Sequence, residues 1–172
     1  MSFWPFAAPV EAKKAADLLA AVIAAARTPA LFSPGRVRDA LDGRFGALAL
    51  VAGLALLRLK SERDLSRRAQ IFTDQVFRHL DAGLREDGVG DLAVPRRMHA
   101  LAGRFYGALA AYEAGLAGDE AALVGALERN LPGLDQAGLV WLAAQVRALH
   151  ARLGATPAAQ LALPEVWRWA GD

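Results

Sequence analysis

The chain has 172 residues, 55% of them hydrophobic and 22% charged, and a formal net charge of +2. This length and composition suit one folded domain and argue against an intrinsically disordered chain. The sequence contains no cysteine, which excludes disulfides, zinc–cysteine sites, iron–sulfur ligation and thiol catalysis, and a charge of +2 is too small to indicate nucleic acid as a specific partner.

The first half of the chain predicts three helices. Residues 9–27 have an apolar stripe and end at a Thr-Pro pair, because proline disfavours helical geometry in the residue before it. An irregular stretch, 29–43, leads to a second helix over 44–60, which is apolar nearly all round and is therefore placed centrally. A third helix covers 64–86, where apolar residues recur every fourth position, and the polar linker 61–63 is expected to supply its N-cap.

Three further helices are predicted after the next loop, each opened by a proline or an aspartate; they cover residues 95–117, 119–131 and 135–154. We expect Gly118 to end the first of them in a left-handed conformation and Gly154 to stop the last. Pro164 begins a final turn that carries Trp167 and Trp169.

No segment shows the alternation of a half-buried strand, so the predicted fold class is all-α. We expect a single compact helical domain of about six helices over residues 1–172, with a helical core at 9–154 and irregular arms at 1–8 and 155–172. The most apolar segment, 45–57, is shorter than the roughly 20 residues that span a bilayer, and the N-terminus lacks a basic residue ahead of its apolar stretch. We therefore expect no transmembrane segment and no secretory signal, in a protein that is cytoplasmic or peripheral at the inner membrane.

The sequence offers few residues for catalysis. His79, His99 and His150 fall on three different predicted helices, and none has a metal-ligand spacing to a second histidine or a carboxylate on its own face. The run Gly88-Val89-Gly90 looks like a phosphate loop only superficially, since it follows a helix and no lysine completes it. We predict no enzyme activity, no catalytic residue, no metal and no cofactor; a haem- or metal-handling protein, with a site assembled across helices, stays open as an alternative.

The segment that enters the second helix, residues 39–45, is too constrained for an ordinary connector. Asp42 can accept hydrogen bonds from the exposed amides at the helix start, where its negative charge is also favoured. Gly43 permits unusual dihedral angles or a close approach. The role of Arg44 stays open between two interpretations. It forms an ion pair with Asp39 or Asp42, or it contacts a partner.

The loop at residues 84–97 is the second constrained stretch. Its two glycines flank Val89, so the chain can turn sharply while Val89 points inward. Arg96 and Arg97 follow in the first turn of a helix, where cations oppose the helix dipole. Two interpretations stay open for these arginines: an internal salt-bridge cluster with nearby carboxylates such as Asp91, or contact with a partner or anionic lipid.

Several pieces of the sequence form one ordered pattern: Ala26-Arg27-Thr28-Pro29, Asp42-Gly43-Arg44-Phe45, Leu84-Arg85-Glu86, Gly88-Val89-Gly90-Asp91-Leu92, Val94-Pro95-Arg96-Arg97, Phe105-Tyr106-Gly107 and Ala126-Leu127-Glu128-Arg129-Asn130. Together they resemble the ubiquinol–cytochrome c chaperone family, known in bacteria and mitochondria. The resemblance covers about residues 18–131, and the loop from Leu84 is its most specific part. The family often carries a histidine in the helix after Gly-Arg-Phe, where this chain has approximately Val51.

The resemblance implies an assembly factor and not an enzyme. Mitochondrial members help newly made cytochrome b mature into respiratory complex III, acting with a partner protein and near the ribosome. It implies that this chain binds cytochrome b or another complex III subunit. A general adaptor that docks on the ribosome or a membrane surface is the other hypothesis for a binding protein.

A chaperone for an apolar client needs a surface that binds without irreversible burial. We predict this partner-binding surface at the following residues: Asp42, Arg44, Gly88, Val89, Gly90, Asp91, Arg96, Arg97 and Tyr106. The aromatic residues of the two arms are further candidates for contact with a client: Phe3, Trp4, Phe6, Trp167 and Trp169. Arg104 lies two helical turns from Arg97 on the same face, so both can meet anionic lipid or an acidic partner.

Overall fold

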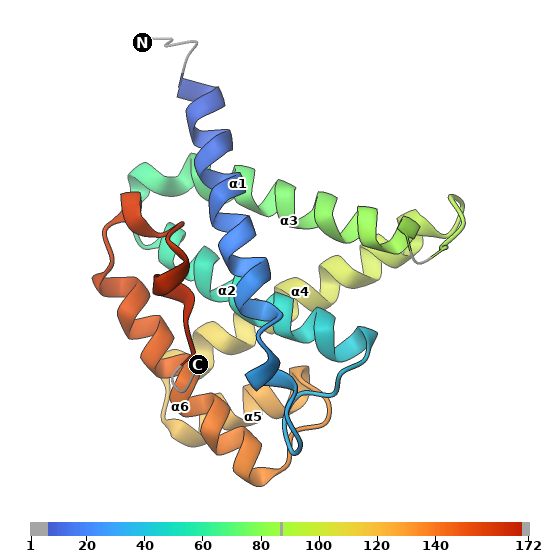
Figure 1. Cartoon of the computed structure of the whole chain (residues 1–172), viewed down its shortest axis with the longest axis vertical. Coiled ribbons are helices and arrows are strands. Elements are labelled where there is room, and N and C mark those ends of the chain that lie inside the picture. Colours follow the sequence, from blue (N-terminus) through green and yellow to red (C-terminus); the bar gives the residue numbers. More distant parts are fainter. Residues whose placement is uncertain (1–6, 87, 170–172) are drawn as a thin grey trace.

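The computed structural model describes residues 7–86 and 88–169. Its α-helices are α1 (Ala7–Ala26), α2 (Leu41–Lys60), α3 (Ser66–Glu86), α4 (Val94–Ala117), α5 (Glu120–Asn130) and α6 (Gln136–Ala155) (Figure 1). Short 3-10 turns lie between and after them: η1 (Pro29–Phe32), η2 (Arg63–Leu65), η3 (Ala158–Gln160) and η4 (Pro164–Trp167). No strand occurs in these two ranges, and the predicted all-α class is confirmed.

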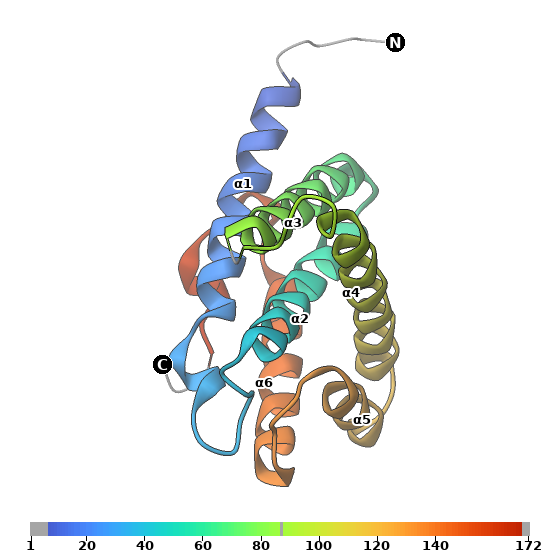
Figure 2. The ribbon, with the colours of Figure 1, turned by 90° about the vertical axis from the view of Figure 1, so that its right-hand side faces the viewer.

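The second helix is the centre of the molecule. Figure 2 shows α2 with α1, α3, α4 and α6 around it, and it packs against all four. Every residue from Ala49 to Leu56 is buried. A helix that is apolar all round is stable only when its neighbours cover it, and each fully buried leucine or valine there contributes roughly 1.5–3 kcal/mol. The central placement predicted from composition is therefore confirmed.

The caps of the last two helices follow the prediction, and so does the end of α4, which stops before Gly118. The amides of Ala122 and Gly138 donate to the Asp119 and Asp135 carboxylates at 2.9 and 2.7 Å. Gly118 is extended (φ −92°, ψ −165°) and not left-handed. It is instead a point of close approach, because a Cβ there would lie 3.0 Å from Ala122 Cβ.

Two other predicted helix signals are wrong. Gly154 does not stop the sixth helix, which continues to Ala155. Ser61 does not cap the third helix, because its hydroxyl donates to the Arg58 carbonyl at 2.8 Å and so belongs to the end of α2. Side-chain bonds of this kind satisfy the carbonyls that a helix end leaves without partners.

The segment after α6 packs on the body of the protein. Trp167 and Trp169 are each 2% exposed. The Trp167 indole donates to the Leu161 carbonyl at 2.6 Å, and the Trp169 indole donates to the Ala25 carbonyl of α1 at 2.9 Å. Both tryptophans are core residues, which corrects their prediction as client contacts. Phe3, Trp4 and Phe6 lie outside the described residues.

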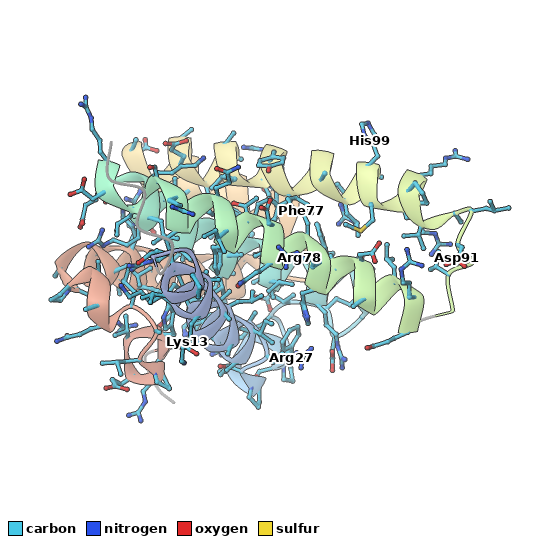
Figure 3. All side chains as sticks on the ribbon, turned by 90° about the horizontal axis from the view of Figure 1, so that it is seen from above. Lys13, Arg27, Phe77, Arg78, Asp91 and His99 are labelled. Carbon is cyan, nitrogen blue, oxygen red and sulfur yellow. The ribbon has the colours of Figure 1, made fainter. Side chains whose placement is uncertain are left out.

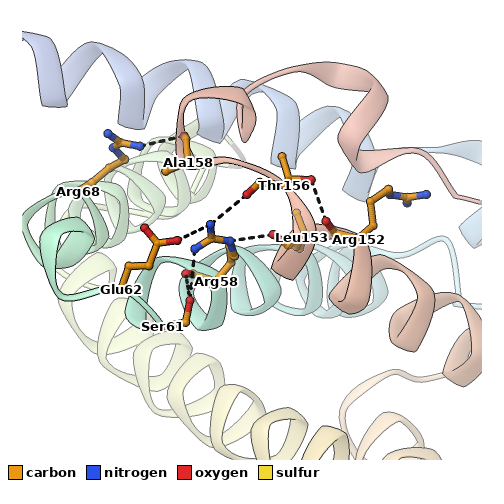
Figure 4. Close-up of polar contacts among 8 residues, drawn as sticks. All are labelled: Arg58, Ser61, Glu62, Arg68, Arg152, Leu153, Thr156 and Ala158. Atoms are coloured by element: carbon orange, nitrogen blue, oxygen red, sulfur yellow. Dashed lines mark hydrogen bonds and ion pairs between the residues drawn. The ribbon is translucent and has the colours of Figure 1, made fainter.

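Two buried arginines hold this C-terminal segment in place (Figure 4). Arg58 donates to the carbonyls of Leu153 and Thr156 at 2.8 and 3.0 Å. Arg68 donates to the carbonyl of Ala158 at 3.2 Å. The carbonyls at the end of α6 and just beyond it therefore obtain donors from α2 and α3, which ties the tail to the central helices.

Candidate functional site

The two constrained stretches of the sequence meet at one hollow in the surface. It has a volume of about 490 Å³ and is lined by Asp39, Ala40, Leu41, Arg44, Leu84, Val89 and Arg97. The first four belong to the entry into α2, whereas the last three belong to the end of α3, the turn after it and the start of α4. We call this the first hollow.

The turn between α3 and α4 is built by a glycine. Gly88 has φ +79°, a backbone conformation that residues with a side chain rarely adopt. Its amide donates to the Arg85 carbonyl at 3.0 Å, and the Val89 amide donates to the Leu84 carbonyl at 3.0 Å. This pair of bonds is the Schellman motif, in which the residue after the glycine also packs on the last turn of the helix. Val89 and Leu84 accordingly lie together in the wall of the first hollow, as the prediction of an inward Val89 requires.

The other wall depends on a close backbone contact at the start of α2. A Cβ on Gly43 would lie 1.9 Å from the Arg38 carbonyl oxygen, so only glycine fits. The Gly43 amide donates to the Asp42 carboxylate at 2.9 Å, and Arg38 forms a longer ion pair with Asp42 at 3.6 Å. The predicted role of Asp42 as an acceptor at the helix start is confirmed.

Ion pairing accounts for two of the arginines in this region. Arg44 Nε donates to Asp39 Oδ1 at 2.7 Å across the entry to α2, which lowers the pKa of Asp39 and raises that of Arg44. At the α3–α4 turn, Arg85 pairs with Asp81 and Asp91 at 2.8 and 2.5 Å. These bonds raise the pKa of Arg85.

The arginines at the start of α4 take no part in those pairs. Arg96 and Arg97 are exposed, and neither forms an ion pair with any residue in 7–86 or 88–169. The salt-bridge cluster at the turn is centred on Arg85, while Arg97 contributes its charge to the wall of the first hollow.

Two predicted site residues need separate placement. Gly90 accepts from the Ala93 amide at 2.8 Å and so shapes the start of α4. Tyr106 is 49% exposed, and its ring lies 5.8 Å from Phe77 of α3 and 5.5 Å from Phe105. Tyr106 therefore belongs to the α3–α4 contact and does not line the first hollow.

Sequence reasoning missed two exposed leucines in this region. Leu41, in the wall of the first hollow, is 64% exposed, and Leu92, in the turn before α4, is 99% exposed. Leu41 adds apolar surface to the first hollow, whereas Leu92 is a single exposed apolar side chain in the turn. The exposure of Leu92 could have been predicted from the sequence, because it is a single leucine between a charged residue and an alanine in a predicted loop.

The three histidines are spread over the described part of the chain. His79, His99 and His150 lie on α3, α4 and α6, and His99 points away from the body (Figure 3). No group of three or more histidine, aspartate or glutamate side chains within residues 7–86 and 88–169 is arranged to hold a metal ion. None of the helices in these ranges is long and apolar enough to cross a bilayer.

A family model described as ubiquinol–cytochrome c chaperone matches residues 35–169. The chain belongs to this family. The crystal structure of the Cbp3 homolog from Brucella abortus is similar, with 36% sequence identity and a TM-score of 0.77 over 89% of this chain and 87% of that one. A search of curated proteins found no match.

The match to the chaperone family extends further toward the C-terminus than the sequence motifs indicated. The matched residues contain both walls of the first hollow and extend past residue 131 through α6 to Trp169. The buried C-terminal segment is thus part of the fold that the family model describes. The expectation that the resemblance ends near residue 131 is corrected.

Proposed function

We propose that this chain is a non-enzymatic chaperone that binds newly made cytochrome b and assists the assembly of ubiquinol–cytochrome c reductase, respiratory complex III. The observation that carries the proposal is the match of residues 35–169 to the ubiquinol–cytochrome c chaperone family. It acts in the cytoplasm or at the surface of the inner membrane, where a membrane-inserting subunit can be received.

The first hollow and the turn beside it are the client-binding face in this proposal. Leu41 and Leu92 offer exposed apolar surface, and Arg97 offers a positive charge that has no acidic partner in the described chain. A hollow of this size receives a few side chains of a client and not a whole helix. Contacts of that kind are reversible, which a chaperone requires because it must release the subunit to the assembling complex.

Site-specific crosslinking in cells tests the proposal. A photoreactive amino acid is placed at Val89, Leu92 or Arg97, with Arg67 as the matched control because it is an exposed arginine at the far end of α3. We expect cytochrome b to be captured from the three positions around the hollow and not from the control. Absence of cytochrome b from all these products, together with normal complex III content after deletion of the gene, would contradict the proposal.

A further inference from the structure

A second hollow lies further along α4, where α2, α4 and α5 meet. It has a volume of about 250 Å³ and is lined by Phe45, Gly46, Ala49, Arg104, Gly107, Ala108, Tyr112, Arg129 and Asn130. Two of these residues are cations and none is a carboxylate. The second hollow therefore differs from the first, whose wall contains the Asp39–Arg44 pair.

The two arginines of the second hollow come from different helices. Arg104 of α4 lies over the Phe45 ring, with its guanidinium carbon 4.6 Å from the ring centroid. Arg129 lies in the last turn of α5. Both are exposed, and neither is ion-paired with a residue in the described ranges. Because no acidic side chain of the described residues neutralises them there, the two charges favour an anion in the space that they share, against the partial negative charge of the α5 C-terminus.

The wall near Arg104 leaves room for such an anion. At Gly107, one turn after Arg104, no atom outside the backbone of its own helix lies within 4 Å of the place that a Cβ would take, so a ligand can approach α4 closely there. Tyr112 also lines the hollow, and its buried hydroxyl has no hydrogen-bond partner among the described residues. The hydroxyl itself is closed to the hollow because it has almost no exposed surface, so the site rests on the two arginines.

We propose that the second hollow binds a phosphate group. Two guanidinium groups present several planar donors, and a phosphate has enough acceptor oxygens to engage both at once. The small volume admits such a headgroup but excludes a helix of a partner protein. The phosphate is supplied either by an anionic lipid headgroup or by a small soluble molecule, and the chemistry of recognition is the same.

Titration of the full chain with inorganic phosphate, followed by nuclear magnetic resonance, tests the site. We expect saturable shifts of the amides around Arg104 and Arg129. The double variant Arg104→Gln with Arg129→Gln should bind at least tenfold more weakly. A control double variant with the same net charge, Arg67→Gln with Arg78→Gln, changes two exposed arginines of α3 that do not line the hollow and should bind as the parent does.

Vesicles distinguish the two sources of phosphate. If the parent and the control variant, but not the Arg104/Arg129 variant, sediment with phosphatidylglycerol vesicles and not with phosphatidylcholine vesicles, the ligand is a lipid headgroup. Binding of inorganic phosphate alone, with the same dependence on the two arginines, assigns a soluble ligand. The proposal is overturned if neither probe binds saturably, or if the control variant loses as much binding as the Arg104/Arg129 variant. This result is independent of cytochrome b capture, which concerns the first hollow.

Discussion

Arg68 shows how one buried charge organises its neighbours. Its side chain is 8% exposed, and Nε donates to Glu11 Oε2 of α1 at 2.8 Å. The same guanidinium reaches the Ala158 carbonyl in the C-terminal segment. A buried cation is tolerated only when it is paired and its donors are satisfied, so α1 and the tail both depend on this one residue of α3.

The Glu11–Arg68 pair makes stability depend on pH. The hydrogen bond from Arg68 is the main cause that lowers the pKa of Glu11 from 4.5 to about 2. Because the folded-state pKa is below the unfolded one, the stabilisation is fully present above about pH 4.5 and is lost as the pH falls toward 2. Glu11→Gln should lower the free energy of unfolding by about 2 kcal/mol at pH 7.

Chemical denaturation at several pH values measures this difference. The gap between the parent and Glu11→Gln should shrink as Glu11 itself becomes protonated. Glu113→Gln is the matched control, because Glu113 is exposed on α4, and it should change stability little at any pH. An equal gap at pH 7 and at pH 2 would show that the carboxylate charge is not what stabilises the contact.

The sequence could predict contacts of single residues only where the partners are near in the chain. Asp119 and Asp135 were identified as caps because the amides that they bind lie three residues away. The pairing of Glu11 with Arg68 joins residues from two helices, and it depends on how α1 packs on α3. Burial of Trp169 was missed for the same reason, because its partner is the Ala25 carbonyl in the first helix.

At the scale of elements, the position of α2 is fixed where the chain enters it. The Arg38 amide donates to the Pro132 carbonyl at 2.8 Å, so the segment before α2 is attached to the link between α5 and α6. The Arg38 carbonyl then lies against Gly43. The wall of the first hollow is consequently supported by elements from the other end of the chain.

Gly43→Ala tests this support directly. The added Cβ would meet a backbone oxygen at 1.9 Å, so the entry segment or α2 must shift. We expect the free energy of unfolding to fall by about 3 kcal/mol, at the upper end of the usual overpacking cost. Gly103→Ala on α4 is the matched control, because a Cβ added there would have no atom within 4 Å outside the backbone of its own helix. This substitution should raise the free energy of unfolding by about 0.5–1 kcal/mol through helix propensity.

Urea unfolding of the two alanine variants gives the comparison. The opposite signs separate a steric effect from a general effect of losing a glycine. If both substitutions stabilise the protein, the close approach of Gly43 to Arg38 does not exist in solution.

The helices themselves were predictable because their apolar periodicity is local. The six predicted segments correspond to α1 through α6, and α2 differs most at its start, which is Leu41 and not Arg44. That difference arises because the Arg44 amide already donates to the Ala40 carbonyl, a bond within the constrained stretch. The sequence placed Gly118 correctly at the end of α4 but not its conformation, because this glycine is used for packing. The signal at Gly154 failed because this residue remains helical.

At the scale of the whole molecule, the candidate site is a product of tertiary packing. The sequence indicated that residues 39–45 and 84–97 were unusual, but it contained no information that they face each other across one hollow. The second hollow was not predictable either, because α5 supplies Arg129 and only the packing of α4 on α5 brings it near Arg104. Both hollows lie along the contact of α2 with α4, which makes this side of the protein its candidate binding side.

The C-terminal segment packs on α1. The substitution Trp169→Ala tests how much this contact contributes to the free energy of unfolding. Trp169 is 2% exposed and joins the last described residues to α1 through the Ala25 carbonyl. Trp169→Ala removes a large buried side chain and its hydrogen bond to that carbonyl, which keeps only the longer 3.3 Å bond from the Thr28 amide. We therefore expect a loss of about 3–5 kcal/mol in the free energy of unfolding. Leu163→Ala is the control in the same segment, because Leu163 is 42% exposed and its loss should cost less than about 1 kcal/mol.

Hydrogen exchange should accelerate in residues 156–169 of the Trp169 variant. Unchanged protection there would mean that Arg58 and Arg68 hold the segment without the tryptophan.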